Sequence, residues 1–435
     1  MAMATLVLRD IGELLTMNGP APTGSSRTEQ IARAELSLGK VEDAVLIVVD
    51  GLVHYAGSTN DAPPIHLLPQ PVTVVTARGQ LVSPGLCDPH THLIWAGDRS
   101  REFELRNLGA TYQQIAEQGG GILSTVEKTS AADDETLVEG LRRRLDTALT
   151  LGTTLCEVKT GYGLWPTAEL RLLRILASVA QSHVCRVSPT FLCHVPPPEA
   201  KSGEPRARLV ADLAASLPTA LSLGADALDV YCDQGAFTFD ETRELFLAAR
   251  AAGLGLRCHA EQFTHTGVAA LAAAFDALSV EHLEQLDAEG RRALVESRSR
   301  RPGGTVANLL PGAALQLRLP WPDAAALFGD GVTVALGTDC NPGSSYTQSQ
   351  PLMMSLACSY MGLSCAEAWL AVTVNAAQAI GRPTLGRLVP GAAADFVLWD
   401  ADHYRQVCQQ LGGNPVRDVW ISGEPCVRQG VRLSD

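Results

Sequence analysis

The sequence predicts an α/β protein in which a (β/α)8 TIM-like barrel is joined to a small β-sandwich domain formed by both chain ends. Three observations favour this fold: β-rich segments at each end of the chain, eight short apolar runs between them, and helical periodicity in most intervening segments. Strands that alternate with helices form parallel βαβ units, and eight units close into a barrel of about 250 residues. We therefore expect residues 1–83 and 384–435 to form the small domain and residues 84–383 to form the barrel.

The two chain ends carry short apolar segments and turn signals. Near the N-terminus the strand candidates are Thr5–Arg9, Ala44–Val49, Leu52–Tyr55 and Val72–Thr76, with the turn dipeptide Asp50-Gly51 after the second. Near the C-terminus they are Ala394–Trp399, Val416–Ile421 and Pro425–Val431. Because the long middle of the chain has a different pattern, we expect both ends to contribute to one domain.

Eight apolar runs follow one another through the middle of the chain. They are Leu81–Cys87, Thr153–Val158, Val184–Phe191, Ala227–Tyr231, Gly255–Cys258, Ala277–Val280, Gly304–Leu310 and Val332–Gly337. Asp240–Ala252 illustrates the helices expected between them, since apolar and alanine positions recur there every three or four residues. A capping-box pattern at Ser364 and Glu367 predicts a helix over Ala366–Ile380.

Composition disfavours several classes of function. The apolar fraction of 46% supports a large core, and the net charge of -13 argues against binding to nucleic acid or a membrane surface. The 11 cysteines form no CxxC pair, which is typical of reduced thiols in the cytosol. We recognise no secretory signal near Met1 and no apolar run of about 18 residues, so we expect a cytoplasmic protein.

The strongest local motif is Asp88-Pro89-His90-Thr91-His92, which directly follows the first apolar run. Residues two apart on a strand point to the same side. His90 and His92 can therefore bind one cation together, at about 2.0–2.1 Å for zinc. The alternative is a pair of polar histidines at a strand end without a ligand.

Further ionisable residues follow later runs. His259 comes at the end of the fifth run, His282 at the end of the sixth and Asp339 at the end of the eighth. In these barrels the C-terminal strand ends carry the active site. We therefore predict a metal centre with His90, His92, His259 and Asp339 as ligands. For His282, a purely structural role remains an alternative.

Three histidines and one carboxylate hold one divalent ion and leave room for water. A second ion would need a bridging anion such as a carbamylated lysine, and Lys159 lies at the second run rather than between the fourth and fifth. Zinc is the default for such ligands, although iron also fits. A metal here lowers the pKa of a water towards about 7. With Asp339 taking the proton and His282 orienting water or polarising the carbonyl, we predict hydrolysis of a C–N bond.

The motifs around these residues resemble those of the imidazolonepropionases, a family of the amidohydrolase superfamily. The resemblance covers nearly the whole chain and rests on Pro84–His92, Ala96–Arg99, Glu102–Glu104, Gly119–Val126, Glu157–Leu164, His259–Gln262 and Gly337–Ser345. It implies opening of the 4-imidazolone-5-propanoate ring to N-formimidoyl-L-glutamate in histidine degradation. It also implies one divalent or trivalent metal ion, zinc or iron, and is compatible with a homodimer.

The resemblance also implies roles in substrate binding. Arg99 corresponds to the arginine that binds the substrate carboxylate, which its planar guanidinium can hold with two hydrogen bonds. The other expected substrate contacts are Tyr162, His194, Gln262, Asn341, Gly343 and Ser344, and Gln262 is also expected to help His282 position water and ring. The alternatives are an Arg99 ion pair with Glu102 or Glu104, core packing of Tyr162, and a plain turn after Asp339.

Two segments leave the interpretation open. Thr190–Pro196 is one residue shorter than the corresponding segment of the family, so His194 can point elsewhere than expected. Gly119–Gly121 is either the hinge of a flexible lid or a tight turn that requires positive φ.

Two other functions compete with this interpretation. A cyclic amidine deaminase of the same superfamily would share the metal ligands and release ammonia, but a neutral base needs no carboxylate-binding arginine. A non-catalytic barrel scaffold is expected to lose ligands, whereas none is missing here. Product analysis separates the first alternative from a ring-opening hydrolase, and metal analysis separates the second.

Overall fold

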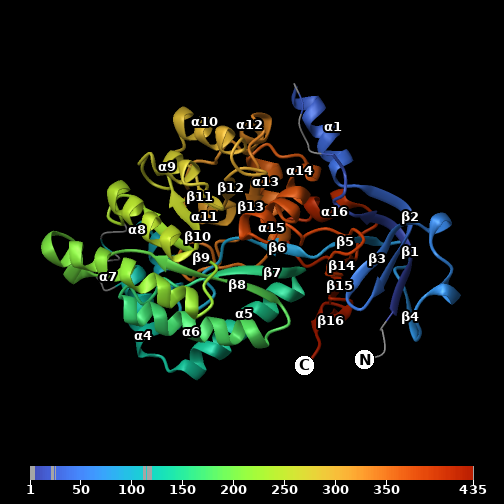
Figure 1. Ribbon diagram of the computed structural model, residues 1–435, viewed down its shortest axis with the longest axis horizontal. Coiled ribbons are helices and arrows are strands. Elements are labelled where there is room, and N and C mark those ends of the chain that lie inside the picture. The colour runs from blue at the N-terminus through green and yellow to red at the C-terminus, as the bar shows by residue number, and fades with distance from the viewer. Residues whose placement is uncertain (1–4, 21–23, 25, 111–113, 115–119, 435) are drawn as a thin grey trace.

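The computed structural model describes residues 5–20, 24, 26–110, 114 and 120–434, and it contains two β-sheets (Figure 1). One is an eight-stranded parallel sheet from the middle of the chain, and the other is a nine-stranded mixed sheet from both ends. The fold class predicted from the sequence is thereby confirmed. The division into residues 1–83 with 384–435 and residues 84–383 stays our proposal for the domain boundaries.

The barrel strands follow one another in chain order, each parallel to the next. They are β6 (Leu86–Asp88), β7 (Thr153–Lys159), β8 (Arg186–Cys193), β9 (Ala227–Cys232), β10 (Gly255–Ala260), β11 (Ser279–His282), β12 (Val306–Leu309) and β13 (Val334–Leu336). Nearly every residue of these strands is buried, as expected for strands covered on both faces.

Helices surround the barrel and bury apolar stripes against it. They are α2 (Ser100–Asn107), α4 (Ile122–Ala131), α5 (Asp134–Thr150), α6 (Pro166–Ser182), α7 (Gly203–Ser222), α8 (Phe239–Ala252), α9 (Val268–Ala274), α10 (Ala288–Ser297), α11 (Pro311–Leu317), α12 (Ala324–Gly329), α13 (Gln350–Tyr360), α14 (Cys365–Ala371) and α15 (Val374–Ile380), with the 3-10 turn η3 (Pro198–Ala200). In α6, for example, Leu172, Leu176 and Val179 recur at helical spacing and are all buried. Among the described residues, no helix has both the length and the apolar character needed to cross a membrane.

The barrel closes at a seam between its first and last strands, β6 and β13. The Gln350 side chain donates hydrogen bonds to the carbonyls of Cys87 and Leu336, one on each strand, at 3.0 Å each. Beyond the strand ends, the Asp339 amide donates to the His90 carbonyl, also at 3.0 Å. The closure therefore brings together the segments that carry two of the predicted metal ligands.

The second sheet combines β1 (Thr5–Leu15), β2 (Lys40–Val49), β3 (Leu52–Ser58), β4 (Val72–Thr76) and β5 (Leu81–Pro84) with β14 (Phe396–Trp399), β15 (Val416–Ile421), β16 (Glu424–Arg428) and β17 (Val431–Arg432). The pairing of β5 with β14 joins the two chain ends. Apolar side chains from both chain ends share a core in which the rings of Phe396 and Trp420 stack with centroids 4.6 Å apart, and other strand residues pack into the barrel core or a small third cluster. The remaining elements of this region are α1 (Arg27–Ser37), η1 (Thr59–Asp61), η2 (Ile65–Leu67) and α16 (Tyr404–Gln409).

The prediction of one strand over Leu81–Cys87 is wrong, because this run is divided between the two sheets. Ser83 of β5 pairs with β14, whereas Cys87 of β6 pairs with β7. Gly85 lies at the break, where a Cβ atom would come within 2.1 Å of the Thr154 hydroxyl oxygen. Both halves are buried and apolar, so composition alone contains no sign of the division.

The prediction of one helix over Ala366–Ile380 is also wrong. The capping box at Ser364 is confirmed, but the helix ends at Ala371 and α15 begins at Val374. The break leaves the Val372 carbonyl free to accept a hydrogen bond from the Cys87 amide of β6, at 2.8 Å. Helix α1 was not predicted, because it buries only Gln30, Ala34 and Ser37 and has no apolar face.

The stacked Phe396 ring allows a test of the small-sheet core. We expect Phe396→Ala to lower the free energy of unfolding by about 3–5 kcal/mol, because the ring is fully buried and its loss leaves a cavity. Urea unfolding of the parent and variant measures the difference. Leu411→Ala, at a side chain that is 63% exposed, is the control and should change little. Equal effects of the two substitutions would contradict the packing described here.

Candidate metal centre and active site

His90 and His92 follow β6 at the C-terminal end of the barrel and are buried. Their Nε2 atoms lie 3.5 and 3.3 Å from the same Oδ1 atom of Asp339. His259 comes from β10, across the barrel, and its ring centroid lies 4.5 Å from that of His90. One ring nitrogen of each histidine falls within 4.8 Å of the others. The four predicted ligands, distant in sequence, therefore converge.

These side chains fit a metal ion by their chemistry. Both ring nitrogens of His90 and Nδ1 of His92 are buried without a hydrogen bond, which is costly unless another ligand satisfies them. Burial lowers the pKa values of His90 and His259 to about 3, so both rings are in the neutral form that binds metals. Although burial opposes it, the contacts with His90 and His92 keep the pKa of Asp339 well below its usual range.

Two carboxylates lie beside the Nδ1 atoms of His259 and His90. Asp229 Oδ1 lies 3.0 Å from His259 Nδ1 in a hydrogen bond, and Glu281 Oε2 lies 3.2 Å from His90 Nδ1 without hydrogen-bond alignment. The hydrogen bond with Asp229 fixes the His259 ring and leaves its Nε2 free to bind a metal ion. The sequence analysis missed both carboxylates: Asp229 lies inside an apolar run, and Glu281 lies between a run and His282.

Lys159 is part of the same buried network. Its Nζ atom lies 2.8 Å from Glu157 Oε1 and 2.8 Å from Asp229 Oδ2. The amine is thus held by two carboxylates below the site. This placement agrees with the argument that it does not bridge two metal ions.

His282 ends β11 and faces the same centre, with its ring centroid 5.4 Å from that of His259. Its φ of 75° is unusual for a residue other than glycine. Burial opposes the charged form, but Glu284 and Asp339 raise the pKa of His282. The sequence analysis missed Glu284, whose two carboxylate oxygens are buried without hydrogen bonds. Gln262 is also buried at this end of the barrel, three residues after His259.

Arg99 occupies the rim of the site beside Gly343. The ion pair that was considered as an alternative role for Arg99 is present, since Arg99 Nε donates a hydrogen bond to the Glu102 carboxylate at 2.8 Å. The guanidinium packs so tightly that a Cβ atom at Gly343 would lie 2.2 Å from its Nη1 atom. Arg106, also missed from the sequence, donates to the Gly343 carbonyl at 2.8 Å. Two guanidinium groups therefore lie at one turn near Asp339.

Asn341 builds the turn after Asp339. Its Oδ1 atom accepts hydrogen bonds from the Gly343 and Ser344 amides at 2.8 Å each, and its Nδ2 donates to the Asp339 carbonyl at 2.7 Å. The Ser344 hydroxyl reaches Asp339 Oδ2 at 3.3 Å. The turn that was considered as an alternative is therefore real, and it fixes the proposed metal ligand.

Aromatic rings line another side of the site. The His194 ring stacks on His92 with centroids 5.6 Å apart, and the Tyr162 ring lies 5.9 Å from that of His194. The shorter segment before His194 thus still brings it to the histidine cluster. Tyr231, which the sequence analysis missed, contacts both His194 and His259.

Part of the glycine-rich segment lies outside the described residues, including Gly119. Gly121 has a φ of 78°, as the tight-turn alternative requires, and its amide donates to Glu102 at 3.0 Å. The flexible-lid alternative stays a prediction.

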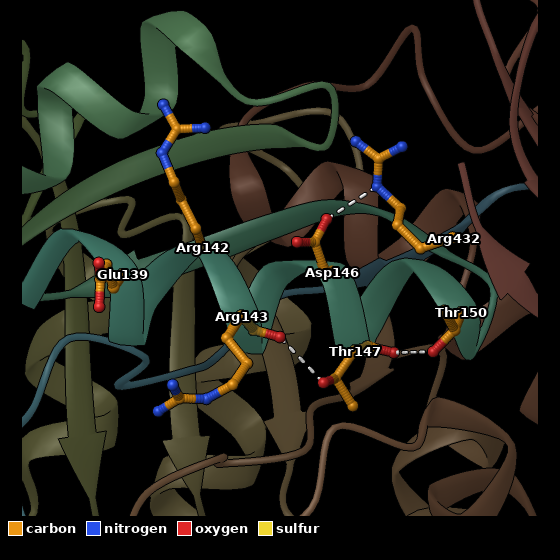
Figure 2. A pocket seen from close by; sticks show the side chains of 7 residues that line it. All are labelled: Glu139, Arg142, Arg143, Asp146, Thr147, Thr150 and Arg432. Carbon is orange, nitrogen blue, oxygen red and sulfur yellow. Dashed lines mark hydrogen bonds and ion pairs between the residues drawn. The ribbon is translucent and has the colours of Figure 1, made fainter. Parts of the chain in front are cut away.

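The cavity in Figure 2 lies elsewhere. It has a volume of about 460 Å³ and is lined by Glu139, Arg142, Arg143, Asp146, Thr147, Thr150 and Arg432. Most of these residues belong to α5, which ends just before the start of β7. The cavity therefore lies near the N-terminal ends of the barrel strands, opposite to the end that carries the histidines. It has no part in the metal centre.

Comparisons with known proteins agree with this geometry. Residues 81–426 match the model of the Amidohydrolase family. The imidazolonepropionase of Deinococcus radiodurans is 43% identical over 385 residues, which cover 88% of this chain and 92% of that protein. The imidazolonepropionase of Geobacillus kaustophilus is 38% identical over 98% of this chain and 99% of its own. An adenosine deaminase from Xanthomonas campestris, solved with bound zinc, superposes with a TM-score of 0.71 at 18% identity, covering 99% and 94% of the two chains.

The Asp229 contact predicts a specific effect on metal binding. We expect Asp229→Asn to weaken metal affinity about 10- to 100-fold, because His259 loses its charged partner. Competition with a chromophoric chelator measures the affinity. Asp226→Asn is a matched control, since Asp226 precedes the other end of β9 and pairs with Arg382. Unchanged affinity in Asp229→Asn would show that His259 is not a ligand oriented in this way.

Proposed function

The chain belongs to the imidazolonepropionase family of the amidohydrolases, and we propose that it hydrolyses 4-imidazolone-5-propanoate to N-formimidoyl-L-glutamate in histidine degradation. The observation that carries this proposal is the convergence of His90, His92, His259 and Asp339 beside an arginine at the site rim. The metal ligands supply the hydrolytic centre, and Arg99 supplies a partner for the propanoate.

We propose that one metal ion, zinc or iron, is held by His90, His92, His259 and Asp339. Such an ion lowers the pKa of a water towards about 7 and polarises a carbonyl oxygen. The buried ring nitrogens without hydrogen bonds support this assignment. A bridging group for a second ion is not supplied by Lys159, which is already held by Glu157 and Asp229.

The protein side chains provide the proton transfers. Asp339 accepts a proton from the attacking water as a bond forms to the ring carbonyl carbon, and it returns the proton to the ring nitrogen when the C–N bond breaks. The Ser344 hydroxyl near Oδ2 and the Asn341 contact to the backbone hold this carboxylate in place. His282 and Gln262, which lie at neighbouring strand ends, position the attacking water and the substrate ring.

Substrate binding completes the proposal. Arg99 binds the propanoate carboxylate, and its ion pair with Glu102 keeps the guanidinium directed at the turn around Gly343. Tyr162 and His194, whose side chains lie beside His92, contact the imidazolone ring of the substrate. Asn341, Gly343 and Ser344 contribute the remaining contacts. We also propose a cytoplasmic location and a homodimer, with no nucleic-acid or membrane partner.

Metal removal tests the hydrolytic centre. After dialysis of the enzyme against a chelator, we expect the absorbance of 4-imidazolone-5-propanoate to stay constant, because no metal then promotes ionisation of the attacking water. One equivalent of zinc or iron should restore activity in the parent but not in His259→Ala. Measurement of ammonia in the same assay should give none. Full activity without metal, or ammonia release, would refute the proposed reaction.

Arg99 tests substrate recognition. We expect Arg99→Ala to reduce kcat/KM roughly 100-fold or more, mainly through KM, because a charged partner of the propanoate is lost. Steady-state kinetics at low substrate measures this change. Arg101→Ala, at an exposed position of α2 two residues after Arg99, should behave as the parent. An Arg99→Ala enzyme as active as the parent at low substrate would refute the carboxylate role.

A further inference from the structure

Three cysteines from three helices meet outside the barrel. Cys358 lies near the end of α13, Cys365 is the first residue of α14 and Cys408 belongs to α16. These helices lie side by side next to the small sheet in Figure 1. The three sulfur atoms all lie within 4.8 Å of one another, and no other three cysteines of the described chain do so.

The surroundings of these thiols suit a ligand site. Cys408 is buried, whereas Cys358 and Cys365 are half-buried, so the cluster is shielded but reachable from solvent. The Cys408 thiol donates a hydrogen bond to the Cys365 carbonyl at 3.9 Å, which connects α16 to the start of α14 within the cluster. Thiolates are the form that binds metal ions, and a bound cation offsets their negative charge.

The spacing favours a shared ion over a disulfide. Zinc–sulfur bonds of about 2.3 Å place three sulfurs roughly 4 Å apart around one ion. The observed spacing needs only small side-chain movements to reach that arrangement. A disulfide would join two sulfurs at about 2.05 Å and leave the third out. All the described cysteines are free thiols.

We propose that Cys358, Cys365 and Cys408 form a second metal site, which binds one thiophilic d10 cation such as Zn²⁺ or Cu⁺. Three sulfur donors select such ions over the hard cations that prefer oxygen. Binding releases up to three thiol protons to the buffer, and neither metal nor sulfur changes oxidation state. The site joins α13, α14 and α16, so its ion ties the helices after β13 to the segment that follows β14.

A cadmium titration tests the site directly. The reduced enzyme is first loaded with one equivalent of its activity-restoring metal and then titrated with Cd²⁺. We expect one further equivalent to bind, with a thiolate-to-cadmium charge-transfer band in the ultraviolet and a matching mass increase in native mass spectrometry. Cys365→Ser should lose the band and the mass increase. The control Cys426→Ser removes a buried thiol outside the cluster and should retain both.

The outcomes separate the second site from the catalytic centre. A mass increase of one Cd²⁺ without loss of the activity-restoring metal shows that Cd²⁺ has not displaced the catalytic metal. If Cys365→Ser does not fold, as judged by circular dichroism, Cys358→Ser at another half-buried thiol replaces it. The proposal is overturned if the loaded parent binds no further Cd²⁺, if the serine variants bind it as the parent does, or if two of the three cysteines are isolated as a disulfide.

Discussion

Backbone hydrogen bonds between the segments after β6 and β13 hold both the barrel and its metal centre together. The two short strands do not form a ladder with each other among the described residues. Instead, the Asp339 amide donates to the His90 carbonyl and the His92 amide donates to the Cys340 carbonyl, each at 3.0 Å. Barrel closure and ligand alignment therefore result from the same contacts. Binding of a cation to these residues stabilises the closed barrel in turn.

Below the ligands lies a buried ionic network that depends on this closure. Glu157, Asp229 and Glu281 face Lys159 and Arg257 in a region closed to solvent. Carboxyl groups outnumber cations there by one, but burial raises the pKa of Glu281, so the excess negative charge comes mainly from the proposed metal carboxylate, Asp339. Burying such an excess is unfavourable unless a positive charge compensates for it. A divalent ion among the histidines supplies that charge, so the network and the metal centre stabilise each other.

The sequence predicted the features that recur along the chain, but not those that arise from tertiary contacts. Regular spacing of apolar runs identified the barrel, and polar residues at their ends identified His90, His259 and Asp339. The oriented carboxylate of Asp229 was missed, because it lies within an apolar run and only folding places it behind a histidine. The division at Gly85 was missed for a similar reason, since the two short buried strands on either side of it read as one continuous run in the sequence.

The absence of a side chain at Gly343 has a consequence for the evolution of substrate range. The Arg99 guanidinium occupies the space that any Cβ atom at this position would need. A mutation of Gly343 alone would push the guanidinium aside, whereas a smaller residue at position 99 would free that volume. A change of specificity towards uncharged rings is therefore easiest when the arginine is lost before the glycine is enlarged.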